Sequence, residues 1–303
     1  MSLDLACGEP AFVDLTFVGL DAVPRPGEER HAADLARSPG GGAITAIGAA
    51  RLGLASALAS PLGADPEGDF LRAALAREGV RWTGRAVART PVTVVLPAQG
   101  ERAMATYDPG TAVTAAELAA GDPRAVVVGI PRIPLAPAGA RVYAAVGDAD
   151  ARARLDLDAL ERADALLVNE REARLLSGRE DAEDAARALG EHVACAVVTL
   201  GAAGALAAAG GDVVRVPGVR AGAVDTTGAG DLFGAAYVWG DLQDLDLEER
   251  LRWAVLYAGL SVGVPTAVAG AVSAERLVLE GKRHGLALPA RAASMSTETR
   301  RTR

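Results

Sequence analysis

The sequence predicts an α/β fold, with a mostly parallel central sheet flanked by helices and a small, separate β-sheet. Three observations lead to this prediction. Short apolar runs alternate with helical patterns through most of the 303 residues. Several of these runs are apolar at nearly every position, which is typical of strands buried on both faces of a parallel sheet. Two further stretches are rich in strand-forming residues and have no helix between them.

The alternation of strands and helices favours repeated strand–helix–strand units. The expected strands are Leu3–Gly8, Ala55–Leu62, Ala125–Ile130, Arg141–Ala145, Ala165–Asn169 and Ala194–Leu200. The expected helices are Ile44–Leu52, Glu67–Glu78, Leu155–Ala163, Glu170–Leu176 and Asp181–Leu189. We therefore expect a single large domain that covers residues 1–289.

The two strand-rich stretches, Phe12–Val18 and Arg81–Tyr107, interrupt that alternation. The second is typical of a hairpin with its turn at Gln99–Gly100–Glu101. We expect a small sheet inserted into the large domain, with strands within residues 11–35 and 80–108. Such a sheet could act as a lid that excludes water from reacting groups. Residues 290–303 form a polar tail that we expect to be disordered.

The charge balance and the apolar segments exclude some classes of protein. The formal net charge is −8, and Lys and Arg do not cluster before the last few residues, so we expect no binding to nucleic acid. The uncharged stretch Trp253–Ala274 contains Pro265 and mostly small apolar residues. This composition favours a buried helix followed by an apolar loop over a membrane span.

The cysteines and the N-terminus indicate a cytoplasmic protein. Cys7 and Cys195 lie far apart within apolar runs, which is typical of buried thiols in a reducing compartment. The segment MSLDLACGEP lacks a basic region followed by an apolar one, so it does not resemble a signal peptide.

One stretch combines an anion-binding pattern with a carboxylate. Gly228-Ala229-Gly230 lies directly before a helical pattern that runs from Leu232. Small residues at a helix start let backbone N–H groups approach an anion, and the helix dipole adds a favourable potential. A carboxylate at Asp231 would repel phosphate, but it suits a group that takes a proton from an attacking hydroxyl. Taken alone, the pattern fits an ordinary helix cap equally well.

Two motifs together resemble those of a known family. The run Asp225-Thr226-Thr227-Gly228-Ala229-Gly230-Asp231 resembles the C-terminal signature of the ribokinase-like (PfkB-type) carbohydrate kinases. The N-terminal signature is similar to Gly40-Gly41-Gly42, Ala50-Arg51-Leu52-Gly53 and Gly63-Ala64-Asp65 with Gly68. The resemblance covers residues 3 to 285 and implies a Rossmann-like ribokinase fold. It also implies Asp231 as general base and the amides of Gly228, Ala229 and Gly230 as an anion hole.

The resemblance further implies residues that bind ATP and Mg²⁺. Asn169-x-x-Glu172 resembles the family's motif near Mg²⁺ and the phosphates. Thr199, Gly201 and Gly204 resemble the turn beside the nucleotide. Simpler alternatives exist for both patterns. The first fits a helix cap followed by a surface glutamate, and the second fits a tight turn that needs glycine.

Other positions are implied to bind the acceptor and a monovalent cation. Asp14, Gly41, Gly42 and Thr45 stand where the family binds its substrate, although Asp14 also fits an exposed position on an alternating strand. Asp225 and Thr227 stand where some relatives bind K⁺.

The sequence departs from the family pattern at two places. Ile44 occupies the position of an asparagine that usually contacts the sugar, and an isoleucine cannot hydrogen-bond a hydroxyl. Thr45, the next residue, could replace it only in part. Val146-Gly147-Asp148 stands where many members carry Asp-Pro or Asn-Pro, and this loop could still line the site.

The expected function is ATP-dependent phosphorylation of an alcohol group on a small sugar or sugar-like molecule. A nucleoside kinase and a 2-keto-3-deoxygluconate-type kinase are alternatives with the same chemistry, and a non-catalytic sugar- or nucleotide-binding regulator is one from another class. A P-loop kinase is excluded because the only lysine, Lys282, lies outside any G-x-x-x-x-G-K-[ST] pattern. The exposed strand edges of the lid favour a homodimer through that sheet.

Overall fold

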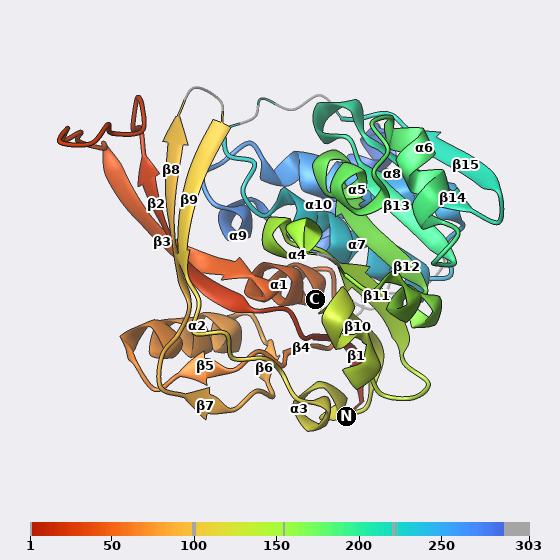
Figure 1. The fold of residues 1–303 in the computed structure, drawn as a ribbon, viewed down its shortest axis with the longest axis horizontal. Coiled ribbons are helices and arrows are strands. Elements are labelled where there is room, and N and C mark those ends of the chain that lie inside the picture. Colours follow the sequence, from red (N-terminus) through yellow and green to blue (C-terminus); the bar gives the residue numbers. More distant parts are fainter. Residues whose placement is uncertain (1, 99–100, 154, 220–221, 223, 288–303) are drawn as a thin grey trace, which may run out of the picture.

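The computed structural model describes residues 2–98, 101–153, 155–219, 222 and 224–287 (Figure 1). Within these ranges the larger sheet has nine strands in the order β15-β14-β13-β12-β11-β10-β1-β4-β6. Its neighbours pair in parallel except at β13–β14 and β14–β15, so the predicted mostly parallel sheet is confirmed. The strands are β1 (Leu3–Cys7), β4 (Ser56–Leu58), β6 (Arg81–Trp82), β10 (Pro123–Gly129), β11 (Arg141–Ala145), β12 (Ala165–Asn169), β13 (Cys195–Thr199), β14 (Ala205–Ala209) and β15 (Asp212–Val216).

Helices cover both faces of this sheet, because alternate strand residues point to opposite sides. On β1, Leu5 and Cys7 join one hydrophobic cluster and Ala6 joins the other. The first face packs against α1 (Gly42–Arg51), α2 (Pro66–Arg77), α7 (Ala229–Leu242), α8 (Leu247–Ser261) and α10 (Ala274–Arg283). The second packs against α3 (Ala115–Ala119), α5 (Glu170–Ser177), α6 (Ala182–Leu189) and the 3-10 helices η1 (Ile130–Leu135) and η2 (Leu157–Arg162).

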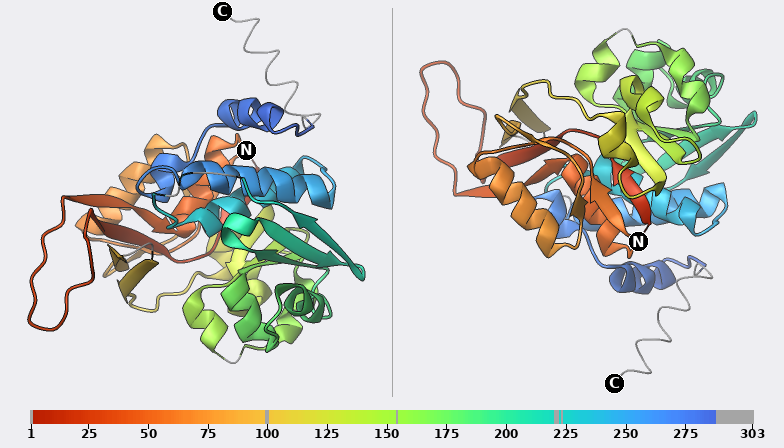
Figure 2. Two further views of the ribbon diagram at one scale, coloured as in Figure 1. Left: turned by 90° about the horizontal axis from the view of Figure 1, so that it is seen from above. Right: turned by 90° about the horizontal axis from the view of Figure 1, so that it is seen from below.

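A small sheet stands beside the large one, and the loop between its first two strands extends away from the body of the molecule (Figure 2). Its strand order is β3-β2-β8-β9, with β2 and β8 parallel and the other pairs antiparallel. These strands are β2 (Ala11–Val18), β3 (Asp34–Gly41), β8 (Val92–Ala98) and β9 (Glu101–Tyr107). The remaining short elements are β5 (Leu62–Gly63), β7 (Ala86–Val87), α4 (Asp148–Arg152), η3 (Gly201–Ala203) and α9 (Ala267–Gly270).

The strands of the small sheet differ in extent from the predicted ranges. β3 continues to Gly41, because all eight residues of β2 pair with the return strand, from Ala11 with Gly41 to Val18 with Asp34. The stretch Arg81–Tyr107 supplies strands to three sheets, since β6 joins the large sheet and β7 pairs with β5. The hairpin β8–β9 is present, while its predicted turn residues 99–100 lie outside the described residues, as does the predicted tail of residues 290–303.

Other element boundaries also differ for physical reasons. The predicted strand Ala55–Leu62 divides into β4 and β5, because Pro61 has no N–H to donate to a ladder. The predicted helix Leu155–Ala163 is instead the 3-10 helix η2, which has only six residues before Asp164 pairs with β11. In the apolar segment Trp253–Ala274, the predicted buried helix is the second part of α8, which ends at Ser261, but the predicted loop after it contains the short helix α9. Within the described ranges we find no helix with the length and apolarity that crossing a membrane requires.

Candidate active site

The chain places successive strands of the large sheet on one side of β1 and then on the other side. Strands β4 and β6 continue from one side of β1, whereas β10 to β13 follow on the other side. Ligands of open α/β sheets bind beyond the carboxyl ends of the strands at such a reversal. Glu9 follows β1 there and Arg132 follows β10. Asp231, at the start of α7, lies near Glu9, because the charge of Glu9 helps to raise the pKa of Asp231.

The turn before α7 exposes Gly230 to an approaching group, whereas the amide of Ala229 donates to the carbonyl oxygen of Thr226 at 3.3 Å. Gly228 adopts φ 72°, a conformation that side chains other than glycine rarely adopt. A Cβ there would lie 2.5 Å from the Cβ of Ala267 and 2.6 Å from Cδ1 of Ile44. Among the described residues no side chain caps this helix, and a Cβ on Gly230 would meet nothing within 4 Å. The turn therefore has the properties of an anion site.

Asp231 lies in the first turn of α7, which begins at Ala229 rather than at Leu232. Its carboxylate is half-buried and accepts a hydrogen bond from the Thr45 hydroxyl at 3.4 Å. Burial, followed by the negative charges of Asp14 and Glu9, raises the pKa of Asp231 to about 7, while the Thr45 hydrogen bond opposes this shift. A carboxyl group with this pKa can accept a proton near neutral pH.

Asp14 is brought to the same site by the pairing of β2 with β3. Its side chain is 7% exposed and lies against Gly40 on the neighbouring strand. A Cβ on Gly40 would collide with both carboxylate oxygens of Asp14, so glycine at this position makes room for the carboxylate. The charge of Asp14 also raises the pKa of Asp231, so the predicted acceptor-binding residue lies near the predicted base.

The glycine turn from β3 into α1 runs along the site. A Cβ on Gly41 would lie 2.7 Å from Cδ2 of Phe12, and one on Gly42 would collide with the carbonyl oxygen of Glu9. Ile44, in the first turn of α1, is 2% exposed and packs against Gly228. Its apolar side chain therefore supports the turn before α7.

Asn169 and Glu172 form a reciprocal helix cap at the carboxyl end of β12. Asn169 Oδ1 accepts from the amide of Glu172 at 2.9 Å, and Glu172 Oε2 accepts from the amide of Asn169 at 2.8 Å. The helix-cap alternative is thus present in the structure. The pair nevertheless faces the site, because the charge of Glu172 contributes to the raised pKa of Asp231.

The predicted nucleotide turn follows the next strand of the sheet. Thr199 ends β13 and pairs in register with Asn169 on β12. Gly201 and Gly204 bound η3, and a Cβ on Gly204 would lie 2.6 Å from the amide nitrogen of Gly218. This turn therefore needs glycine for packing, and it also lies at the same edge of the sheet as the cap at Asn169.

Asp225 and Thr227 lie in the loop before α7. Asp225 accepts hydrogen bonds from the amides of Thr227 at 2.8 Å and Thr266 at 2.9 Å. Within the described part of the chain, the Thr227 hydroxyl oxygen is buried and lacks a hydrogen-bond partner. A hydroxyl and a carboxylate are oxygen ligands of the kind that hard cations prefer. These residues fit a cation, and their predicted role in K⁺ binding stays a prediction.

Sequence reasoning missed a charged cluster beside the base. Arg132 Nη1 lies 3.4 Å from Glu9 Oε1, and a Cβ on Gly129 would lie within 3.6 Å of Arg132, Glu9 and Asp150. Burial raises the pKa of Glu9 to about 7, against the lowering effect of Arg132. Each of the three charged residues follows the carboxyl end of a parallel strand, and that position was the signal available in the sequence. Asp150 also places the Gly147-Asp148 loop beside the site.

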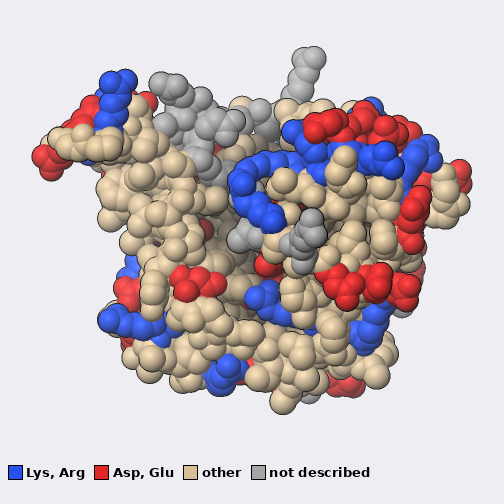
Figure 3. Space-filling view, in the orientation of Figure 1, with Lys and Arg blue, Asp and Glu red and all other residues tan. Residues whose placement is uncertain are grey.

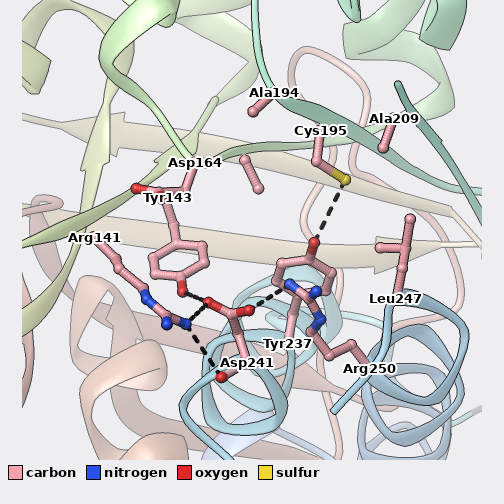
Figure 4. Close-up of a pocket in the computed structure, with 11 residues that line it drawn as sticks. Arg141, Tyr143, Asp164, Ala194, Cys195, Ala209, Tyr237, Asp241, Leu247 and Arg250 are labelled. Atoms are coloured by element: carbon pink, nitrogen blue, oxygen red, sulfur yellow. Dashed lines mark hydrogen bonds and ion pairs between the residues drawn. The ribbon is translucent and has the colours of Figure 1, made fainter. Parts of the chain in front are cut away.

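A separate pocket of about 440 Å³ lies at the opposite ends of these strands (Figure 4). Asp241, near the end of α7, binds Arg141 and Arg250 at 2.5 Å each and accepts from the Tyr143 hydroxyl. Cys195 Sγ lies 3.5 Å from the Tyr237 hydroxyl on the pocket wall. These contacts hold the carboxyl end of α7, whereas its amino end carries Asp231.

The chain belongs to the pfkB family of carbohydrate kinases, whose family model matches residues 11–273. A ribokinase of Haemophilus influenzae is 28% identical over 263 residues, which cover 78% of this chain and 85% of that protein. A deoxyribokinase of Salmonella typhi is 35% identical over 120 residues, and a ribokinase of Lactococcus lactis is 30% identical over 109 residues. The chain spans only 39% and 35% of the lengths of these two relatives.

Solved structures agree on the fold. The ribokinase of Thermotoga maritima superimposes with a TM-score of 0.81 at 21% identity, over 92% of this chain and 99% of that one. Arabidopsis thaliana ribokinase, solved in complex with ribose and ATP, gives a TM-score of 0.78 at 24% identity, over 92% of this chain and 98% of that one. The predicted ribokinase-like fold is therefore confirmed.

Proposed function

We propose that this protein transfers the γ-phosphoryl group of ATP to a hydroxyl of a small, uncharged sugar-like molecule. The single observation that carries the proposal is the position of Asp231. A carboxyl group with a pKa of about 7 lies in the first turn of α7, next to the exposed Gly230 and at the point where the sheet order reverses. A proton acceptor next to an anion site is the arrangement that phosphoryl transfer to an alcohol requires.

In this proposal each residue has a separate task. Asp14 and the turn at Gly41–Gly42 orient the acceptor, and Asp231 accepts the proton of the attacking hydroxyl. The new bond joins the acceptor oxygen to the γ-phosphorus while the bond to the bridging oxygen of ADP breaks. The amides at Gly228–Gly230 stabilise the charge on the transferring group.

ATP as the donor is supported by relatives of this fold. The Arabidopsis ribokinase was solved with ATP and ribose, and a ribokinase of Cryptococcus neoformans was solved with ADP. Thr199, Gly201 and Gly204 are proposed to lie beside the nucleotide. Asp225 and Thr227 would hold K⁺, for which the buried Thr227 hydroxyl is a suitable ligand.

Mg²⁺ is proposed to reach the site with the nucleotide. Within the described ranges, no three His, Cys, Asp or Glu side chains form a ready metal site. This fits Mg²⁺, which usually binds through one or two carboxylates, water and substrate phosphates. Asn169 and Glu172 would hold it through water. When bound, Mg²⁺ would supply positive charge to the phosphate oxygens.

The charges around the acceptor side favour an uncharged substrate. Glu9, Asp14, Asp150 and Asp231 face this region, and Arg132 is already paired with Glu9. A carboxylate on the acceptor would add to this repulsion, so a sugar acid of the 2-keto-3-deoxygluconate type is disfavoured. A nucleoside has no such charge and remains a candidate, and an adenosine kinase of Sinorhizobium meliloti shares the fold with a TM-score of 0.74.

The small sheet is proposed to act as a lid over the acceptor. β2 carries Asp14, and β3 ends at Gly41, directly before Gly42. The sheet therefore contributes groups to the site itself, and closing it would exclude water and complete the acceptor contacts.

The test is ADP release from MgATP across pentoses, hexoses, sugar acids and nucleosides, with Asp231→Ala as the blank. We expect an uncharged acceptor to give a signal that the variant loses. A sugar acid as the best acceptor would overturn the proposed substrate class. Silence across the panel with intact ATP binding would favour the alternative of a non-catalytic binder.

A further inference from the structure

Helices α1 and α7 interlock around the base. Ile44 of α1 contacts Gly228, and a Cβ on Gly48 would lie 2.6 Å from Cδ2 of Leu232. Thr45 lies between these two contact points on α1, as Asp231 does on α7. Close packing on both sides of this pair therefore fixes the separation of Thr45 and Asp231.

Thr45 is a buried residue. The residue is 3% exposed, and its Oγ1 lies 3.4 Å from Asp231 Oδ1. Burial raises the pKa of the Cys7 thiol, and the influence of the Thr45 hydroxyl opposes this shift. When Asp231 is ionised its carboxylate can only accept, so the threonine proton then points to Asp231.

We propose that Thr45 is a positioning residue for the base: its hydroxyl holds one carboxylate oxygen of Asp231 and thereby leaves the other for the acceptor. This inference rests on the proposed function. It assigns Thr45 to the base, whereas the family resemblance implied contact with the substrate. Two neighbouring residues of α1 then contact the start of α7: Ile44 packs against Gly228, and Thr45 hydrogen-bonds Asp231.

The hydrogen bond also has an electrostatic consequence. The charged groups around Asp231 are Asp14 from β2, Glu9 after β1 and Glu172 from α5, and all three disfavour its ionised form. Thr45 is the group that opposes them by donating to the carboxylate. Without the hydroxyl, a larger fraction of the base is protonated at neutral pH and turnover falls.

The test compares Thr45→Val, which removes the hydroxyl at similar size, with Thr45→Ser, which keeps it. We expect Thr45→Val to lower kcat roughly tenfold and to move the acid limb of the pH–rate profile upward by about one pH unit. KM for the acceptor stays near the wild-type value, because the hydroxyl does not touch the acceptor. Thr45→Ser restores both kcat and the acid limb.

Two outcomes would overturn the inference. A higher acceptor KM with an unchanged acid limb would show that Thr45 contacts the acceptor, and wild-type kinetics would show that the hydroxyl has no role. If the valine variant does not fold, as judged by ATP binding, Thr45→Ala is measured in its place. Asp231→Asn is assayed in parallel: an active Asp231→Asn rejects the proposed base, whereas an inactive one with a normal Thr45→Val rejects only the role of Thr45.

Discussion

At the scale of residues, Asp231 is placed so that its protonation changes near neutral pH. Burial and the charges of Asp14 and Glu9 raise its pKa to about 7. Because a base must be ionised to accept a proton, we expect kcat to rise with pH through this value and to level off above it. Steady-state kinetics at saturating MgATP measure this limb.

A matched variant tests whether the charge of Glu9 acts on this limb. Glu9→Gln removes one of the negative charges that raise the pKa of Asp231, so the acid limb should move to lower pH. Two results would contradict this account: a kcat that does not change with pH across neutrality, or a Glu9→Gln variant whose acid limb moves to higher pH.

The same raised pKa means that ionised Asp231 lowers the free energy of unfolding. The folded protein raises the pKa of this carboxyl from its ordinary value of 3.8 to about 7, so the folded state binds the proton more tightly than the unfolded chain does. The ionised carboxyl therefore destabilises the fold increasingly as pH rises from 3.8 to about 7. Asp231→Asn should raise the Tm at neutral and alkaline pH, and the gain should disappear below pH 3.8. A Tm at or below wild type throughout would contradict this linkage.

At the scale of elements, α7 is held at both ends by different means. Its amino end packs through Gly228 on Ile44, and its carboxyl end is held by Asp241, which is bound by Arg141 and Arg250. A carboxylate near a helix carboxyl end opposes the helix dipole, so these cations are needed to stabilise it.

We expect Asp241→Asn to lower the free energy of unfolding by about 1–3 kcal/mol, because it leaves the partly buried guanidinium of Arg250, and the more exposed one of Arg141, without their charge partner. Urea unfolding measures the change. Glu183→Gln is the control, since it removes an exposed ion pair with Arg187 on α6 and should cost about 0.5 kcal/mol or less. Equal effects of both variants would contradict a special role for Asp241.

The sequence predicted the elements best where apolar runs were continuous. Arg141–Ala145 and Ala165–Asn169 have the bounds predicted for them, because their burial on both faces leaves a clear pattern. The division at Pro61 and the 3-10 helix η2 depend on local hydrogen bonding that an apolar pattern does not show.

The site was predictable only in part. The motif around Asp231 indicated a base and an anion site, and the pairing of β2 with β3 brings Asp14 to it. Glu9 and Arg132 are single charged residues with no motif, and they meet only because β1 and β10 are neighbours. The contact of Thr45 with Asp231 joins residues 186 positions apart and needs the packing of two helices.

At the scale of the whole molecule, the small sheet has two open edges, β3 and β9. Its outer strand β9 exposes Met104 and Tyr107, and β3 exposes Leu35, each to more than half of its area. Figure 3 shows Lys, Arg, Asp and Glu side chains on the larger part of the molecule. Open strand edges with exposed apolar side chains favour pairing with a second copy.

We therefore predict a homodimer through the small sheet. Leu35→Asp should shift the molar mass measured by light scattering toward the monomer. Leu279→Asp is the control, because this residue is exposed on α10, which belongs to the large domain. A wild-type protein that is monomeric at all concentrations would reject the prediction, and so would equal dissociation by both variants.

The most direct test of the account is the turnover of Asp231→Asn on the preferred acceptor, measured together with ATP affinity. The account predicts that kcat falls by roughly 10²–10⁴, the range for a positioned general base, while ATP binding stays near wild type. Turnover close to wild type with the same acceptor would contradict the central claim that Asp231 takes the hydroxyl proton.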